Sequence, residues 1–412
     1  MIKLVELLLT ADLYNKYENL SEDDIPKNMR KVLYGGKGIK RPLTVKLDMA
    51  QQYCGDLKEA KKVPFIDYNT FNKQYTLTSF DVAAKWFVEN AGEEEIEKNP
   101  VLAYYFENYD SLGVSYEKSK QKNAPKHSDR EWLRNALAEM EKSEDTAQML
   151  GLVRVYSPED IKADFNEIAL NSDQIDEIKK INIALNEREF LRKIGMIDIG
   201  KLLFIGPPGT GKTTTARSLG KKIGLPLVEV KLSMITSQFL GETSKNIEKI
   251  FEISKRLNPC ILFIDEFDYV AKTRTSDEHA AVKRAVNTLL KSIDEINLVE
   301  DGVILIAATN HPNLLDSAVW RRFDKIVEFP EPSDLMRKRI FELVLSKVPG
   351  DYEIDELVDI TEGFTGAEIN LVVREAILRA LLKNEYKVGH NDLIKAVDDV
   401  KSRANLKYSF AK

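Results

Sequence analysis

Residues 206–213 (GPPGTGKT) combine glycines with a lysine and a hydroxyl side chain at fixed spacing. They follow the apolar run 201–205 and precede a segment, 214–219, that suits the first turns of a helix. Glycines at these positions let backbone N–H groups approach phosphate oxygens, and the N-terminus of the next helix carries partial positive charge. The pattern predicts a phosphate-binding loop between a strand and a helix. A glycine-rich turn without a ligand is the alternative.

Two side chains of this loop have the chemistry to hold a magnesium nucleotide. The Lys212 ammonium can reach the β and γ phosphates, and the Thr213 hydroxyl can ligate Mg²⁺. The other loop residues expected at the same site are Pro208, Gly209, Thr210, Gly211 and Thr214. ATP and Mg²⁺ are therefore the expected cofactors.

Two carboxylates follow a second apolar run. Residues 261–264 (ILFI) predict a buried strand, and Asp265 and Glu266 come directly after it. In open α/β sheets, ligands gather at the carboxyl ends of the strands. We expect Asp265 to support Mg²⁺ and Glu266 to act as the general base that polarises the attacking water. The alternative for this pair is an ordinary acidic start of a helix.

Three further polar residues extend the predicted catalytic set. Asn310 follows the apolar run 303–307 and is predicted to hold the attacking water or contact the γ-phosphate. A turn-forming asparagine is the alternative. Arg321 and Arg322 have planar, permanently charged side chains, and we expect them to enter the site of a neighbouring subunit. An ion pair within the chain is the alternative for the arginines.

Strand and helix patterns alternate between residues 155 and 331. The predicted strands are 201–205, 227–230, 261–264, 303–307 and 326–329, and the helix-length stretches include 212–222, 245–256 and 281–294. The alternation predicts an α/β fold, with a parallel sheet covered by helices on both faces. Together with the phosphate loop of residues 206–213, this is the fold class of a P-loop NTPase. The later patterns, 334–346, 354–361, 366–384 and 390–402, are helical. Residues 332–412 are therefore predicted to form a small helical domain.

A separate N-terminal domain is predicted for residues 1–116, which are rich in Tyr and Phe and show no pattern of catalytic or metal-binding residues. We expect the aromatic side chains to fill a small core, with an exposed binding patch as the alternative. The polar, basic stretch 117–127 predicts a flexible linker, or alternatively a nucleic-acid-binding tail. Ser128 then begins the pattern of an amphipathic helix. Residues 117–154 are thus predicted to be a linker and a helix between domains.

Composition limits the class of protein. The chain has 412 residues, of which 43% are hydrophobic, as expected of a globular protein of two or three domains. Its net charge of -6 gives no general attraction to nucleic acid or anionic lipid, so no nucleic-acid partner is expected. Cys54 and Cys260 are too few for a disulfide framework. No stretch has the length and apolarity of a membrane span, and a cytoplasmic location is expected.

These motifs together resemble the AAA family of ATPases, over about residues 155–400. The phosphate loop, the acidic strand end, the Ala-Thr-Asn strand and the arginine pair occur in the order of that family. Residues 361–369 (TEGFTGAEI) resemble its helical lid motif. The adjacent arginines are similar to those of the katanin- and spastin-like subgroup. The resemblance implies ATP hydrolysis by a large α/β domain, 155–331, and a lid domain, 332–412.

The resemblance also implies residues for the adenine and for a substrate. Ile168 and Ala169 match the positions that contact the base through their backbone, and Gly366 and Ala367 match those that close over it from the lid. The pore-loop residues implied by the resemblance are Phe239, Leu240, Gly241 and, in a second loop, His279. In the family, six subunits form a ring whose pore-loop aromatics grip a polypeptide. Packing of Phe239 in a core is the alternative.

The predicted function is that of a homohexameric motor that hydrolyses ATP and remodels, unfolds or disassembles protein substrates by threading them through its pore. We expect the N-terminal domain to bind the substrate or an adaptor. A nucleotide-gated assembly scaffold and a nucleic-acid-dependent ATPase are the alternatives. Residues 294–296 (DEI) stand where many members of the family have Asp-Gly-Phe, a motif that signals between subunits. Because of this departure, the nucleotide-gated scaffold remains an alternative.

Overall fold

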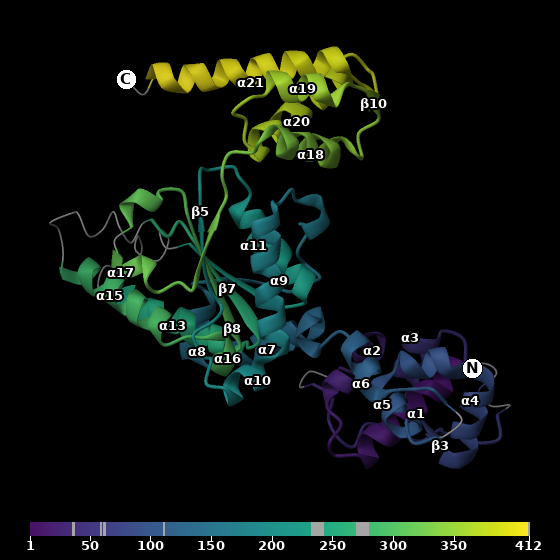
Figure 1. Ribbon diagram of the computed structural model, residues 1–412. Helices are drawn as coiled ribbons and strands as arrows, with labels where there is room; N and C mark the ends of the chain where they lie inside the picture. Colours follow the sequence, from purple (N-terminus) through teal and green to yellow (C-terminus); the bar gives the residue numbers. More distant parts are fainter. Residues whose placement is uncertain are drawn as a thin grey trace. The chain divides into compact units, whose positions relative to one another are not determined.

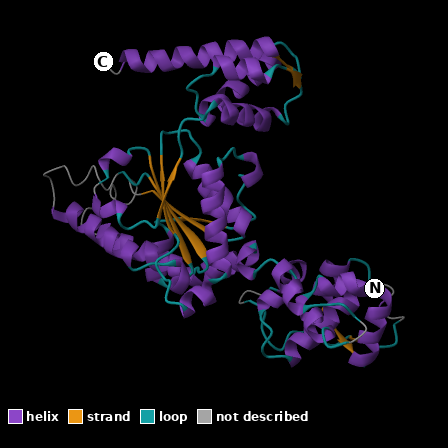
Figure 2. Cartoon of the chain, viewed as in Figure 1, coloured by secondary structure: helices purple, strands orange, loops and turns teal. Residues whose placement is uncertain are grey.

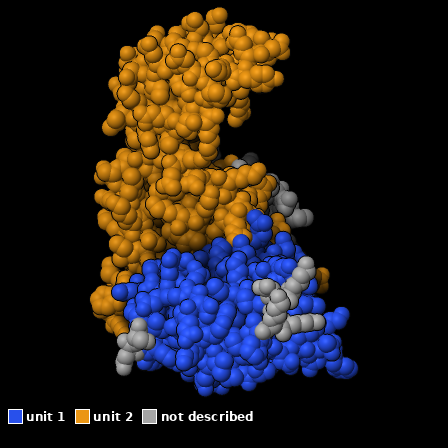
Figure 3. All heavy atoms as spheres, turned by 90° about the vertical axis from the view of Figure 1, so that its right-hand side faces the viewer, with its two compact units in different colours: residues 1–142 blue, residues 143–412 orange. Residues whose placement is uncertain are grey.

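The computed structural model describes residues 1–34, 38–57, 60, 63–109, 112–231, 243–268, 280–315 and 317–410. The chain divides into two compact units, Met1–Lys142 and Ser143–Lys412 (Figure 3). Unit 2 contains the predicted α/β domain and the predicted helical domain.

A six-stranded sheet forms the centre of the α/β domain (Figure 2). Its strands are β4 (Arg154–Tyr156), β5 (Lys201–Ile205), β6 (Leu227–Lys231), β7 (Cys260–Asp265), β8 (Val303–Thr309) and β9 (Lys325–Glu328). They are ordered β4-β6-β7-β8-β5-β9, and all neighbours are parallel except β4 and β6. The five predicted strands are confirmed. The antiparallel β4 was not expected, because three residues are too short to show a periodic pattern.

Helices on both faces explain why the central strands are almost entirely apolar. The helices of this domain are α8 (Glu144–Leu150), α9 (Ser172–Asn186), α10 (Arg188–Lys193), α11 (Lys212–Ile223), α13 (Thr243–Arg256), α15 (Ala280–Asp294), α16 (Leu298–Asp301) and α17 (Ser317–Trp320). In Figure 1, α9 and α11 lie on one side of the sheet, and α13 and α15 lie on the other. Every residue of β8 is buried as a result. The predicted fold class is confirmed.

The C-terminal part of unit 2 is helical, as predicted. Its elements are α18 (Asp334–Leu345), α19 (Ile354–Ile360), α20 (Gly366–Leu382) and α21 (His390–Phe410), with the two-residue strands β10 (Gly350–Asp351) and β11 (Val388–Gly389) paired in parallel. Phe341, Leu357, Val372 and Leu393 belong to one buried core that joins the four helices. Thr365 caps α20, since its hydroxyl and the Glu368 side chain satisfy backbone groups reciprocally. This cap fixes where the first turn of α20 begins.

Unit 1 is mainly helical and has a small antiparallel sheet in the order β1-β3-β2. Its elements are α1 (Ile2–Lys16), α2 (Lys27–Leu33), β1 (Val45–Lys46), α3 (Leu47–Cys54), β2 (Ile66–Asn69), β3 (Gln74–Leu77), α4 (Phe80–Glu97), α5 (Pro100–Phe106), α6 (Tyr116–Lys122) and α7 (Arg130–Glu141). Phe65, Tyr75, Phe87 and Phe106 are buried in its core. Phe71, by contrast, is 97% exposed, because it lies in the turn between β2 and β3.

The segment 117–127 differs from the predicted flexible linker, because it belongs to unit 1, which continues to Lys142. The Asn123 amide donates to the backbone carbonyl of Asp23 at 2.8 Å. The backbone N–H of Lys126 donates to the Asp23 carboxylate at 2.6 Å. The polar groups of this segment thus form hydrogen bonds with residues near the N-terminus of the unit. The polar composition of the segment therefore does not indicate a flexible linker. The predicted domain boundary at residue 116 is corrected accordingly.

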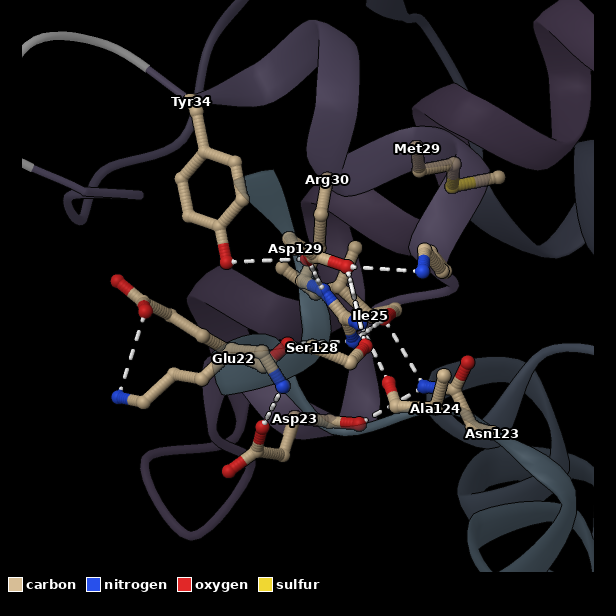
Figure 4. A network of polar contacts seen from close by, with 12 residues as sticks. Glu22, Asp23, Ile25, Met29, Arg30, Tyr34, Asn123, Ala124, Ser128 and Asp129 are labelled. Carbon is tan, nitrogen blue, oxygen red and sulfur yellow. Dashed lines mark hydrogen bonds and ion pairs between the residues drawn. The ribbon is translucent and has the colours of Figure 1, made fainter. Parts of the chain in front are cut away.

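A buried ion pair holds the same segment in place (Figure 4). The Arg30 side chain has no solvent exposure, and its Nε donates to Asp129 Oδ2 at 2.6 Å. Its other nitrogens donate to the carbonyl oxygens of Ile25 and Ala124. Asp129, rather than the predicted Ser128, is the residue at the N-cap of α7, and Ser128 lies in a short 3₁₀ turn. The pair therefore joins α2 to the start of α7.

Candidate nucleotide site

The predicted phosphate loop lies between β5 and α11, and its shape requires glycine. Gly206 has φ +145°, and a Cβ there would lie 2.0 Å from the carbonyl oxygen of Phe329. Gly211 has φ +102° and caps α11, whose first residue is Lys212. The loop is therefore pressed against the end of β9, with backbone N–H groups at the start of a twelve-residue helix. This is the geometry that receives phosphate groups.

The Lys212 side chain is folded into the loop. Its ammonium donates to the carbonyl oxygens of Gly206 and Pro207, each at 2.7 Å. Only 6% of the residue is exposed, and this burial lowers its pKa to about 8, while Asp265 and Asp268 act in the opposite direction. A desolvated ammonium interacts more strongly with phosphate oxygens than an exposed one.

Thr213, Asp265 and Glu266 are joined by hydrogen bonds at the end of β7. The Thr213 hydroxyl donates to Asp265 Oδ2 at 3.1 Å, and Asp265 Oδ1 accepts the Glu266 backbone N–H at 2.9 Å. A hydroxyl beside a carboxylate is a set of hard oxygen donors that fits Mg²⁺. Glu266 has φ +56°, in the left-handed region that residues other than glycine rarely adopt. Strain of this kind clusters at functional sites, where the surrounding structure maintains it.

Asn310 follows β8, the strand beside β7 in the sheet. The Phe267 N–H donates to the carbonyl oxygen of Ala308 at 2.8 Å, which ties the segment after Glu266 to the end of β8. Glu266 and Asn310 thereby line the same cavity. The two strands thus bring together the predicted general base and the predicted water-binding amide.

The cavity has a volume of about 380 Å³ and is walled by both domains of unit 2. It contains the predicted residues Ile168, Ala169, Pro208, Gly209, Thr210, Gly211, Lys212, Thr213, Thr214, Asp265, Glu266, Asn310, Gly366 and Ala367. The lid approaches the phosphate loop closely, because the Ala367 N–H donates to the carbonyl oxygen of Gly209 at 3.1 Å. A Cβ on Gly209 would lie 2.8 Å from the Thr365 hydroxyl oxygen. Glycine is therefore needed here for contact between the domains.

Five lining residues were not predicted. They are Glu167, Ile340, Leu343, Val344 and Asn370. Ile340, Leu343 and Val344 recur at helical spacing on α18, so the apolar stripe of that helix was a usable signal. Its periodicity could not show whether the stripe faces the lid core or the nucleotide.

The two arginines do not line this cavity. Arg322 forms an ion pair with Asp294, with Nε 3.0 Å from Oδ1. This ion pair is the intrachain alternative to a role in a neighbouring subunit. Its acidic partner, Asp294, belongs to the segment 294–296, which stands where many family members have Asp-Gly-Phe. Arg321 is exposed, and its Nε donates to the carbonyl oxygen of Ser317 at 3.1 Å. The pore-loop residues Phe239, Leu240, Gly241 and His279 lie outside the described residues.

Comparison with known proteins identifies the family of this fold and site. The model of the ATPase family associated with various cellular activities (AAA) matches residues 202–331, and the model of the AAA+ lid domain matches residues 351–395. An uncharacterized AAA family ATPase of Sinorhizobium fredii is 38% identical over 235 residues, which cover 57% of this chain and 70% of that protein. The chain belongs to the AAA family of ATPases. The predicted ATPase activity and nucleotide binding are confirmed with it.

Other relatives of this AAA ATPase carry more specific names. The proteasome-activating nucleotidases of Sulfurisphaera tokodaii and Saccharolobus solfataricus are 35% and 34% identical over 248 and 250 residues. Each match covers 58% of this chain and 63% of the nucleotidase, so the chain spans less than two thirds of their length. The katanin- and spastin-like subgroup stays a prediction. Among the described residues, none of the helices combines the length and apolarity that a membrane crossing requires.

The pKa of Lys212 leads to a prediction for nucleotide binding. Bound phosphates favour the protonated ammonium, whereas the nucleotide-free lysine loses its proton above about pH 8. Binding above that pH must therefore take up a proton, and we expect ATP affinity to fall about fivefold between pH 8 and pH 9. Calorimetric titration at pH 7.5, 8 and 9 measures this dependence.

Lys212→Arg is the matched control, since a guanidinium remains protonated throughout this range. Its affinity should change little with pH, and Lys212→Ala should bind weakly at every pH. If ATP affinity fell equally with pH in the wild type and in Lys212→Arg, the pH dependence would belong to a group other than Lys212.

Proposed function

We propose that this AAA ATPase works as a homohexameric motor, which unfolds or disassembles proteins by drawing them through a central pore. The hydrogen bond between Ala367 and Gly209 is the observation that carries the proposal. It places the lid in direct contact with the loop that surrounds the phosphates. Loss of the γ-phosphate changes the contacts of that loop, and such changes move lids and domains in many nucleotide-driven proteins.

In the proposed mechanism the loop backbone and Lys212 bind the β and γ phosphates. Thr213 and Asp265 would hold Mg²⁺, which supplies charge neutralisation for the transferred phosphoryl group. Glu266 accepts a proton from the attacking water, and the Asn310 amide orients that water in line with the γ-phosphate. Ile168 and Ala169 position the base from one side and the lid from the other.

The two arginines have different parts in this proposal. Arg322 pairs with Asp294 and also donates to the carbonyl oxygens of Leu290 and Ala318, so its redirection would break several contacts. The exposed Arg321 can turn outward after breaking a single hydrogen bond to a carbonyl oxygen. We therefore assign the phosphate-binding role in a neighbouring subunit to Arg321, with Arg322 as the residue that positions this segment.

Substitution of the predicted pore-loop aromatic tests the threading motor. We expect Phe239→Ala to keep ATPase activity within about threefold of wild type and to stop unfolding of a green fluorescent protein with an unstructured tail. A flat ring grips a polypeptide without sequence preference, whereas alanine offers little contact area. Loss of fluorescence under ATP, with a trap for unfolded protein, measures the unfolding rate.

Phe239→Tyr is the matched control and should keep most of the unfolding rate, because the ring remains. A wild type that binds ATP and assembles but never unfolds the probe would favour the nucleotide-gated scaffold. ATPase stimulation by DNA or RNA, and none by unfolded casein, would favour the nucleic-acid-dependent enzyme. Equal unfolding by Phe239→Ala and wild type contradicts the grip assigned to this residue.

A further inference from the structure

The last turn of α11 contacts the segment that leads to the residues assigned to the base. We call residues 164–169 the base segment, because it ends in Ile168 and Ala169, which line the nucleotide cavity. Lys212, in the phosphate loop, is the first residue of α11. The helix has twelve residues, so about 18 Å separate its two ends. One helix therefore contacts the base segment at its end and forms part of the phosphate loop at its start.

Close packing brings the chain before the base segment onto α11. Ile161 belongs to the buried core that also contains Ala216 and Leu219 of this helix. A Cβ on Gly220 would lie 3.2 Å from Ile161 Cδ1, closer than Cβ atoms usually pack. Phe165, which is half-buried, packs against the same core. The absence of a side chain at Gly220 thus lets the chain approach the helix closely.

Two consecutive lysines of α11 contact the base segment itself. The Lys221 ammonium lies 3.2 Å from Asp164 Oδ2. The Lys222 ammonium lies over the Phe165 ring, 3.6 Å from its centroid. The face of an aromatic ring attracts a cation at such a distance. The helix therefore holds the first two residues of the base segment by an ion pair and a cation–π contact.

Asp164 also fixes the conformation of the base segment. Its Oδ1 accepts the Asn166 N–H at 3.0 Å, and the carbonyl oxygen of Phe165 accepts the Ile168 N–H at 3.4 Å. The Asn166 N–H and the Lys221 ammonium lower the pKa of Asp164, so its carboxylate stays charged. These hydrogen bonds form a short 3₁₀ helix that ends directly before Ile168. The conformation of the base segment thus depends on the residue that Lys221 contacts.

We propose that Lys221 and Lys222 are positioning residues for the adenine base. They hold the start of the base segment on α11 and thereby keep Ile168 and Ala169 in the conformation that receives the base. Lysines at the end of a helix also stabilise it through the helix dipole, a contribution that is the same with and without the base. The inference rests on the placement of the base in the proposed mechanism, and it is independent of threading.

Calorimetric titration of the full-length chain with ADP and with pyrophosphate, each with Mg²⁺, tests this role. Pyrophosphate has the two phosphates of ADP without the base, and ADP is not hydrolysed further by an ATPase. We expect Lys222→Gln to weaken ADP about fivefold and pyrophosphate less than about twofold, because a loosened base segment is competent for a smaller fraction of the time. The double variant Lys221→Gln with Lys222→Gln should weaken ADP about tenfold.

Two matched variants separate the contact from the loss of a lysine in general. Lys222→Arg keeps the cation and should bind ADP within about twofold of wild type. Lys179→Gln breaks an exposed ion pair with Asp176 on α9, and it should bind both probes as the wild type does. Equal weakening of ADP and pyrophosphate in Lys222→Gln would overturn the proposal, because damage to the whole helix would also affect the phosphates. Unchanged ADP affinity in that variant would overturn it too.

A double-mutant cycle shows whether Lys222 acts through Phe165. Phe165→Leu keeps an apolar side chain and removes the ring face that attracts the ammonium. The combination with Lys222→Gln should weaken ADP by much less than the product of the two single effects, because either change alone removes the same contact. Single effects that multiply fully would show that the two residues act independently, and this result would contradict the proposal.

Ala169→Leu distinguishes a failure of the positioning role from a failure of the base placement. The larger side chain occupies space at the cavity wall, so ADP should bind at least about tenfold more weakly and pyrophosphate should bind as before. If Ala169→Leu weakens ADP and the lysine variants do not, the base placement stands and the positioning role is wrong. If Ala169→Leu leaves ADP affinity unchanged, the base lies elsewhere and both assignments are wrong.

Discussion

Glu266→Gln is expected to lower kcat for ATP hydrolysis by at least about 100-fold and to leave ATP affinity within about threefold of wild type. The amide keeps the size of the side chain and the backbone of the strained turn, but it cannot accept a proton from water. The phosphate loop and Lys212 are untouched, so binding survives. Steady-state phosphate release and equilibrium titration with ATP measure the two quantities separately.

Glu167→Gln is the matched control, because it makes the same change at another position of the same cavity. Glu167 pairs with Lys347, and we assign it no part in proton transfer. Its kcat should stay within about threefold of wild type. Full turnover in Glu266→Gln, or an equal loss in both variants, would remove Glu266 from the role of general base.

Motif residues were the part of the candidate site that the sequence could predict. The glycines and Lys212 form a motif of fixed spacing, and the carboxylates Asp265 and Glu266 directly follow the apolar run 261–264. Motifs of this kind consist of consecutive residues, so they can be identified from the sequence alone. Ile340 and Asn370 were missed because they reach the cavity only through the docking of the lid, which consecutive residues do not encode.

Arg321 and Arg322 show a second limit of prediction from sequence. The sequence does not distinguish the roles of two adjacent arginines, and both were expected to act in a neighbouring subunit. The structure separates them, because only one of them lies beside the carboxylate of Asp294. The distinction depends on the packing of α15 against the segment after α17, which is a long-range contact.

The prediction of the fold also succeeded for some segments and failed for others. The five parallel strands were predicted from their apolar residues. Burial on both faces makes β5, β7 and β8 nearly continuous apolar runs, whereas β6 includes Glu229 and β9, at the edge of the sheet, is mostly exposed. The segment 117–127 was misassigned, because its polar composition is typical of a linker as well as of a segment that binds backbone groups. Burial of Arg30, nearly a hundred positions earlier, decides between the two interpretations, and the neighbouring Lys27 and Lys31 give no local sign that Arg30 is buried.

Arg30→Ala should therefore destabilise unit 1 by about 3–5 kcal/mol, as expected when one partner of a buried ion pair is removed. Asp129 would keep a buried charge without its closest cation, with the Lys27 ammonium 3.8 Å away, and the carbonyl of Ala124 would lose the donor that Arg30 supplies. Hydrogen exchange measured by mass spectrometry reports this locally, as faster exchange in α2, α6 and α7. A global unfolding curve is less suitable, because a chain of two units need not unfold in one step.

Two controls separate the buried pair from arginine in general. Arg134→Ala removes an exposed partner of Glu131 on α7, and its effect should not exceed about 0.5 kcal/mol. The double variant Arg30→Met with Asp129→Leu removes both charges together and should be more stable than Arg30→Ala, because no charge is left uncompensated. Equal exchange in Arg30→Ala and Arg134→Ala would show that the pair does not hold α7 on the unit. Faster exchange in α2, α6 and α7 of Arg30→Ala, and its reversal in the double variant, is the result that the buried pair requires.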